Sequence, residues 1–234
     1  MPAMIASKKT LAPVLALTLA MGVGSAAQAQ TSLNIEYQST TGIDVMTTGT
    51  PFGYKSGEMS FTTSDGGSFY AYCVELSQGN APTSAGFQTY TLGSFSGTQA
   101  TLLEGLYSSS FATVSSKTDM AAFQVAIWSI MAATPGSTLT VDANGGGNLQ
   151  AIALGTLSKP NTGSSYTQFV SQVDGYLAAA NSYTGPAEYQ LQKLVNPTYQ
   201  DYVVASPVPE PGSYALLLAG LGAVGFIVRR RRAG

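Results

Sequence analysis

The sequence predicts an α+β domain over residues 30–205, in which an antiparallel, β-rich first half packs with a helical second half. Short segments rich in Tyr, Phe, Thr and Val, separated by turn residues, dominate the first half, and longer apolar segments dominate the second. Strands that come first and helices that come later are typical of this class. The 234 residues, 44% of them apolar, suffice for one such core with a segment on either side.

The expected elements divide into an early group of strands and a later group of helices. Strands are expected over 33–38, 59–63, 68–76 and 88–92. Helices are expected over 98–108, 119–133, 149–157 and 166–180. The second helix should begin at a cap formed by Thr118 or Asp119 and end at Pro135-Gly136. Two last strands, 189–195 and 200–205, complete the predicted domain.

The composition argues against most familiar catalytic chemistries. The chain has no histidine, which rules out Ser-His-Asp and Cys-His catalysis and His-ligated zinc or haem. Its single cysteine rules out zinc fingers, iron–sulfur clusters and an internal disulfide. Residues 10–208 carry four lysines against eleven acidic residues, a formal charge of −7 that repels nucleic-acid phosphates. We therefore expect no enzyme, no metal, no cofactor and no nucleic-acid partner.

The first 29 residues have the three parts of a secretory signal peptide. These parts are a positive start, an apolar stretch and a small-residue cleavage site, supplied by Lys8-Lys9, residues 11–23 and Ala27-Gln28-Ala29. The apolar stretch is short for a membrane span, and the residues at 27 and 29 are typical of cleavage. We therefore expect removal after Ala29 rather than an uncleaved helix.

The other end of the chain is predicted to be a membrane helix. Residues 206–212 form a proline-containing linker, because proline interrupts both helix and sheet. Residues 213–228 carry no charge and would rise about 24 Å as a helix, slightly less than the roughly 30 Å of a hydrocarbon core. Four arginines complete this end, Arg229, Arg230, Arg231 and Arg232. Such a cluster keeps its end in the cytoplasm, so the body should face outward.

Val208-Pro209-Glu210-Pro211, the apolar segment after it and the arginine cluster occur in the order found in a known sorting signal. They resemble the PEP-CTERM sorting signal of Gram-negative bacteria, in which an exosortase, a membrane-embedded cysteine protease, processes the tail near Pro209, Glu210 and Pro211. The resemblance implies an exosortase partner, an inner-membrane anchor before processing, and then a place at the cell surface or in the extracellular matrix. A plain single-span anchor is the alternative.

Two segments of the domain point to a reactive site. In 69–76, strand alternation puts Ala71 and Cys73 on one face, and both faces are mostly apolar, so the strand should be central and the cysteine buried. In 118–131, apolar residues cover nearly the whole helix, which indicates burial. Gln124 lies on the least polar stripe of this helix. Its carboxamide therefore needs a partner, because burying it unpaired is costly.

Tyr72-Cys73-Val74-Glu75 and Phe123-Gln124-Val125-Ala126-Ile127-Trp128 form the centres of these segments. They resemble the two signature motifs of bacterial surface thioester domains. In that family the cysteine thiol attacks the glutamine side chain, ammonia leaves, and the thioester later reacts with an amine or hydroxyl on a target. The resemblance implies that Cys73 is the thiol and Gln124 the acyl donor. One position departs from the family: Gram-positive thioester domains have Thr where this chain has Phe123.

The residues around this pair define the expected environment of the thioester. Aromatic cover against hydrolysis is expected from four side chains, Tyr70, Tyr72, Phe123 and Trp128. Because the chain has no histidine to act as a base, we expect the departing ammonia to accept the thiol proton itself, with Glu75 or a tyrosine as a helper. The alternative is that Cys73 packs as a small apolar side chain and Gln124 hydrogen-bonds a neighbouring backbone group.

Two hypotheses of function follow. In the first, the protein is an exported, exosortase-processed surface or matrix protein that attaches covalently to a nucleophile-bearing surface. In the second, it is a non-reactive structural or carbohydrate-binding component of the extracellular polymer, with polysaccharide as its partner. The first hypothesis predicts no titratable thiol in the folded protein, and the second predicts a free one at Cys73.

Overall fold

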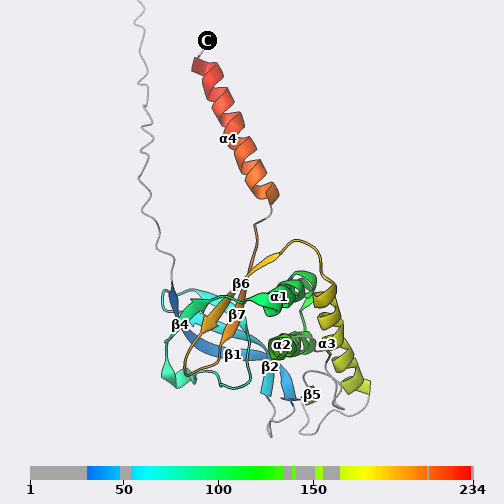
Figure 1. The fold of residues 1–234 in the computed structure, drawn as a ribbon. Helices are drawn as coiled ribbons and strands as arrows, with labels where there is room; N and C mark the ends of the chain where they lie inside the picture. The colour runs from blue at the N-terminus through cyan, green and yellow to red at the C-terminus, as the bar shows by residue number, and fades with distance from the viewer. Residues whose placement is uncertain are drawn as a thin grey trace, which may run out of the picture.

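The computed structural model describes residues 31–47, 54–133, 139–140, 151–154, 164–209 and 211–232. In this part of the chain an antiparallel sheet and three α-helices form one body, and a further helix, α4, follows it (Figure 1). The predicted α+β class is therefore confirmed. The expected signal peptide, with its cleavage site at Ala27 and Ala29, lies outside the described residues.

The sheet closes on itself. Its strands are β1 (Ser32–Thr47), β2 (Tyr54–Thr63), β3 (Ser68–Cys73), β4 (Gln88–Gly93), β5 (Ala151–Leu154), β6 (Tyr189–Val195) and β7 (Tyr202–Pro207). They follow the order β2-β3-β7-β6-β4-β1-β5, and the pairs are antiparallel. Because β2 also pairs with β1, the six strands other than β5 surround an enclosed face and present an outer face.

Aromatic side chains fill the enclosed face. Phe61 and Phe69 are register partners with stacked rings, whose centroids lie 5.3 Å apart. Phe61 also contacts Tyr202 of β7 at 4.7 Å, and Tyr202 lies 5.5 Å from Tyr90 of β4. Cys73 is the register partner of Tyr202 and shares this face. The enclosed face is thus one core that joins four strands, β2, β3, β4 and β7.

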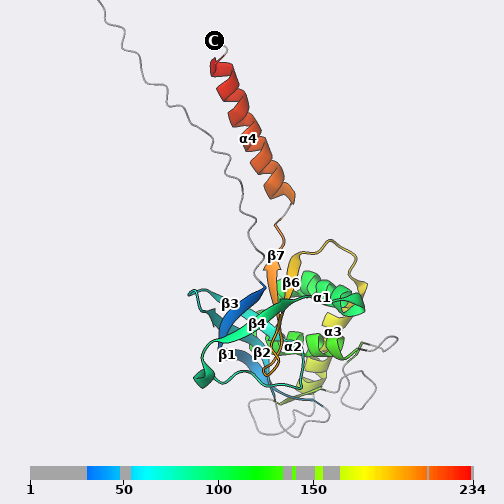
Figure 2. The ribbon, with the colours of Figure 1, turned by 60° about the vertical axis from the view of Figure 1, so that its left-hand side comes forward.

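Three helices pack together on one side of the sheet (Figures 1 and 2). They are α1 (Gly97–Ser110), α2 (Lys117–Ala132) and α3 (Ser164–Ser182), and two short 3₁₀ turns are η1 (Thr83–Ala85) and η2 (Phe111–Thr113). Every residue of α2 from Ala121 to Ile130 is buried. The burial predicted from the apolar circumference of this helix is therefore confirmed.

α2 begins two residues earlier than predicted, with a capping box. Ser116 is the N-cap, and its Oγ accepts a hydrogen bond from the Asp119 N–H at 3.1 Å. In return, Asp119 Oδ2 accepts from the Ser116 N–H at 2.9 Å, so Asp119 is the third helical residue rather than the cap. Gln172 of α3 donates to Asp119 Oδ1 at 2.7 Å, which links the start of α2 to α3. The expected stop at Pro135-Gly136 lies outside the described residues.

The prediction of a helix over 149–157 is wrong. Ala151–Leu154 form strand β5, which pairs with the Asp44–Thr47 end of β1. Four small and apolar residues fit a strand as well as a helix, and the partner decides between them. That partner exists because β1 extends far beyond the predicted 38, supported along its length by β2.

The predicted linker 206–212 is shorter in the structure. β7 continues to Pro207, the register partner of Tyr189, and α4 (Pro211–Arg232) begins at Pro211. Proline is tolerated at a strand end and in the first turn of a helix, so neither proline forces an irregular segment. The helix expected over 213–228 is present within α4. In the described part of the chain, however, no helix combines the length and apolarity needed to cross a bilayer.

Candidate functional site: Cys73 and Gln124

Cys73 ends β3 at a place where the sheet has a gap. β2 pairs with β3 only as far as Met59 opposite Ala71, two residues before Cys73. On the other side, the Val74 N–H donates to the Asp201 carbonyl at 3.1 Å, next to β7. Because successive residues of a strand direct their backbone groups to opposite sides, the N–H and C=O of Cys73 point toward the gap.

Gln124 of α2 fills this gap with its side chain. Its Oε1 accepts a hydrogen bond from the Cys73 N–H at 2.8 Å, and its Nε2 donates to the Cys73 carbonyl at 2.7 Å. The carboxamide thus replaces the missing strand partner and is itself fully buried. α2 is held against β2 at this point by Ser56, whose Oγ donates to the Ala121 carbonyl at 3.0 Å. The structure therefore brings together the two residues predicted from separate motifs.

The Cys73 side chain lies in an apolar environment. Only 5% of the residue is exposed, and its thiol donates to Met59 Sδ at 3.5 Å. Burial, followed by the negative charge of Glu75, raises the pKa of the thiol well above its usual value. The thiol is therefore protonated at neutral pH, which suppresses reaction with solvent oxidants and alkylating agents.

Aromatic rings pack around the residues that precede Cys73 and Gln124. The Tyr72 and Phe123 rings meet edge to face at 5.2 Å, and both residues are buried. Tyr107 of α1 lies 5.0 Å from Phe123, and Phe111 lies 5.6 Å from it. These last two residues were not predicted from the sequence, although aromatic residues four positions apart at the end of a helix indicate that their rings lie on one face.

Of two further aromatic residues expected around the site, Trp128 is buried and Tyr70 is exposed. Trp128, one turn after Gln124 on α2, is 4% exposed and belongs to the core, as expected. Tyr70 is 65% exposed, so it does not cover the site. On the outer face of β3, Tyr70 is exposed to solvent, whereas Tyr72 packs against Phe123 of α2.

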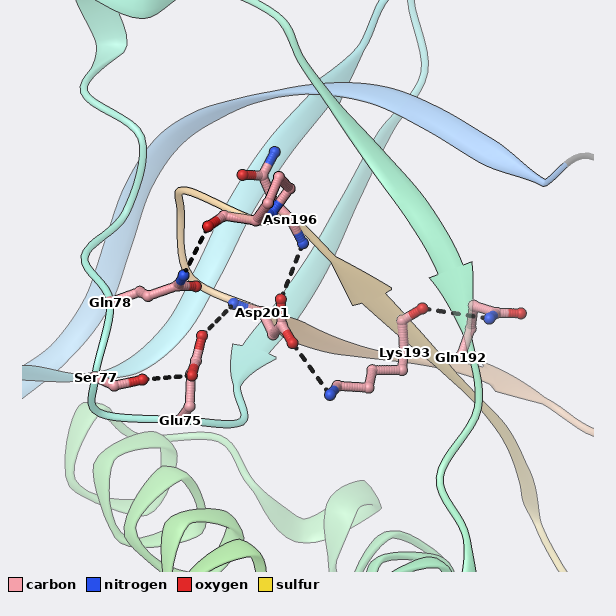
Figure 3. A network of polar contacts seen from close by, with 8 residues as sticks. Glu75, Ser77, Gln78, Gln192, Lys193, Asn196 and Asp201 are labelled. Carbon is pink, nitrogen blue, oxygen red and sulfur yellow. Dashed lines mark hydrogen bonds and ion pairs between the residues drawn. The ribbon is translucent and has the colours of Figure 1, made fainter.

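The hydrogen-bond partners of the Glu75 carboxylate belong to a polar network that does not include the Gln124 carboxamide. Its Oε2 accepts from Ser77 Oγ at 2.5 Å, and its Oε1 accepts from the Asp201 N–H at 3.3 Å (Figure 3). Asp201 in turn forms an ion pair with Lys193 at 3.1 Å and accepts from the Asn196 N–H at 2.9 Å. This network ties the segment after β3 to the β6–β7 connection. It holds Cys73 in position from the side opposite Gln124.

The predicted sorting residues come directly after the last strand of the sheet, β7. The Val208 N–H donates to the Glu188 carbonyl at 2.8 Å, which keeps the chain beside β6 for one residue beyond β7. Pro209 is exposed, whereas Glu210 lies outside the described residues and Pro211 starts α4. Arg229 and Arg230 are exposed near the other end of α4, which also contains Arg231 and Arg232. Among the described residues, no group of acidic or cysteine side chains could hold a metal ion.

Comparison with known proteins gives a match to one family model, and the solved structures with some similarity include two streptococcal domains. Residues 207–232 match the family model of the PEP-CTERM protein-sorting motif, so the chain carries this sorting motif after β7. No curated protein matches the sequence. The N-terminal domain of the Streptococcus pyogenes pilus tip adhesin Cpa is similar in structure, with 15% identity and a TM-score of 0.41 over 79% of this chain and 97% of that one. The N-terminal thioester domain of the fibronectin-binding protein SfbI, also from S. pyogenes, has 12% identity and a TM-score of 0.40. This similarity covers 71% of this chain and 93% of that one.

Proposed function

We propose that this is an exported, exosortase-processed surface or extracellular-matrix protein whose body attaches covalently to its target through a Cys73–Gln124 thioester. The sorting motif at 207–232 supports the first part. The second part is supported by one observation above all, the buried Gln124 carboxamide held against the backbone of Cys73 by two hydrogen bonds.

The sorting half of the proposal follows from the order of parts along the chain. The folded body ends with β7, and the sorting motif, α4 and the arginines come directly after it. Arginines at the end of an inserted helix keep that end in the cytoplasm, which leaves the body outside the inner membrane. An exosortase acting near Pro209–Pro211 would then release the body from α4 to the cell surface or matrix.

The thioester half requires only groups that the chain contains. The Cys73 sulfur attacks Gln124 Cδ, the Cδ–Nε2 bond breaks, and Nε2 leaves as ammonia with the thiol proton. In a later step, an amine or hydroxyl on the target attacks Cδ, forms an amide or ester, and returns the proton and the thiol to Cys73. A carboxamide is a poor electrophile, so the reaction depends on holding it next to the cysteine. Gln124 is attached to Cys73 through both of its polar atoms, which supplies this positioning.

Burial supports the persistence of such a bond. Gln124 and Phe123 have no exposed surface, and Tyr72 is 1% exposed. Water is therefore excluded from Cδ until a target nucleophile arrives or the surrounding rings move.

The test is intact mass spectrometry of the protein after export, without reducing agents or nucleophiles. The proposal expects a mass lower by one ammonia than the mass calculated for the exported polypeptide, and the calculated mass in the Cys73→Ala variant. Incubation with methylamine should add one methylamine to the parent protein and nothing to the variant. The unmodified mass, with a thiol that reacts on unfolding, would contradict the thioester while leaving the sorting proposal intact.

One observation favours a second candidate function. The hydrogen bonds of Gln124 to Cys73 and the contact of the thiol with Met59 satisfy all three polar groups without any reaction. The same geometry therefore suits a non-reactive structural or carbohydrate-binding component of the extracellular polymer. This candidate predicts the unmodified mass and retention by polysaccharide that does not depend on Cys73.

A further inference from the structure

A second site lies on the other face of β3. A pocket of about 240 Å³ is formed between the outer face of the sheet and the end of α1 with η2. Its lining includes Glu58, Tyr70, Tyr72, Tyr107, Phe111 and Val203. Tyr72 and Cys73 are successive strand residues and project to opposite faces, so the pocket is separate from the thiol.

Two residues that line this pocket have buried hydroxyl groups without hydrogen-bond partners among the described residues. Tyr72 and Tyr107 are each 1% exposed. Among the described residues, neither hydroxyl has a hydrogen-bond partner. A buried hydroxyl without a partner is costly, and native proteins leave few of them. Both residues line the same pocket, so one ligand can satisfy both groups.

The charge of the pocket defines the class of ligand. Glu58 is the one carboxylate in the lining, and no lysine or arginine is found among the described residues that line the pocket. Burial raises the pKa of Glu58, because removal from water disfavours the charged form of its carboxyl group. The remaining walls are largely aromatic, and aromatic faces attract cations.

We propose that this pocket binds a primary alkylammonium group, such as the end of a lysine side chain, without covalent reaction. An ammonium has three N–H donors and no acceptor, and the Glu58 carboxylate and the oxygens of Tyr72 and Tyr107 offer three acceptors. The volume lies below the roughly 300–1,000 Å³ typical of pockets for drug-sized ligands, which suits one side chain rather than a sugar chain. This proposal does not depend on the thioester.

The experiment uses the full chain with Cys73→Ala, so that no thioester can consume the amine. Binding of n-butylammonium is followed by NMR of labelled tyrosine rings, with n-butanol as the neutral control of the same length. The proposal expects saturable shifts with the amine and none with the alcohol. Nα-acetyl-lysine methylamide is compared with n-butylammonium to distinguish a peptide lysine from a free amine.

Three variants test the assignment. Glu58→Gln and Tyr107→Phe should each weaken amine binding roughly tenfold or more, because each removes a hydrogen bond to a charged group. Tyr183→Phe should leave binding unchanged, because Tyr183 lies outside the lining of the pocket and its hydroxyl donates to the Pro186 carbonyl. Equal binding of alcohol and amine, unchanged binding in Tyr107→Phe with an unchanged melting temperature, or preferential binding of a methyl glycoside would overturn the proposal.

Discussion

The carboxamide of Gln124 is bonded through both of its polar atoms to the backbone of one residue, Cys73, at distances of 2.8 and 2.7 Å. A side chain of α2 thereby takes the place of a strand at the point where β2 and β3 separate. This arrangement joins the helices to the closed sheet. It also puts the only cysteine of the chain beside a buried amide.

We predict that Gln124→Leu, made in the Cys73→Ala background, lowers the free energy of unfolding by about 3 kcal/mol. Both backbone groups of Cys73 would be left buried without partners, at roughly 1–3 kcal/mol each. Urea denaturation measures the difference from Cys73→Ala alone. Gln38→Leu is the matched control, because Gln38 is exposed and its loss should change stability by about 0.5 kcal/mol or less. Equal effects of the two leucine variants would show that the carboxamide does not support the sheet.

We predict that Phe123→Ala lowers the free energy of unfolding by about 3–5 kcal/mol, because it leaves a cavity among the surrounding rings. Phe123 contacts Tyr72, Tyr107 and Phe111 and has no exposed surface. Phe123→Thr should destabilise at least as much, since it also buries a hydroxyl. The control is Phe87→Ala, a ring that is 49% exposed. A thermal or urea midpoint that is unchanged in Phe123→Thr would mean that threonine is accepted here.

We predict an acid-dependent loss of stability centred on Asp119. Burial opposes its ionisation, but hydrogen bonds from Ser116, Gln172 and Ser115 outweigh this and lower its pKa from 3.8 to about 2. A carboxyl whose pKa is lower in the folded state stabilises the fold above pH 3.8, and this contribution disappears as the pH falls toward 2.

The variant Asp119→Asn should therefore be about 1 kcal/mol less stable at neutral pH, and the difference should shrink as the pH falls through this window. Urea denaturation at neutral pH and at several acidic values measures both quantities. A constant difference between parent and variant across the acidic range would contradict the assignment.

We predict opposite effects of alanine at two helical glycines. Gly175 in α3 is exposed with open space around it, so Gly175→Ala should stabilise by about 0.5–1 kcal/mol through helix propensity. Gly105 in α1 is buried, and a Cβ there would lie 2.4 Å from the Ala180 carbonyl oxygen of α3. Gly105→Ala should thus give a net loss, because α1 and α3 must separate. Stabilisation by both changes, measured as melting temperatures, would show that the α1–α3 contact is not tight.

Local sequence patterns correctly predicted those helices and strands whose conformation is determined by the residues within the segment itself. The segment around Cys73 was predicted as a buried central strand, and the segment around Gln124 as a buried helix, because apolar periodicity is a property of the chain itself. The helix predicted over 149–157 was wrong for the opposite reason, since Ala151–Leu154 become a strand only where the distant end of β1 meets them. Glu75 was expected to help with proton transfer at the thioester, and only the tertiary structure shows that its carboxylate accepts hydrogen bonds from Ser77 and from the Asp201 N–H.

By itself the sequence determined the α+β class, the sorting motif after the body, and a buried glutamine that needs a partner. Tertiary structure decided that β2 pairs with β1 to close the sheet, that β2 and β3 separate before Cys73, and that Gln124 enters there. It also decided that Glu58, Tyr72 and Tyr107 line one pocket. These outcomes depend on contacts between residues tens of positions apart, where the energy of pairing and burial belongs to both segments together and to neither alone.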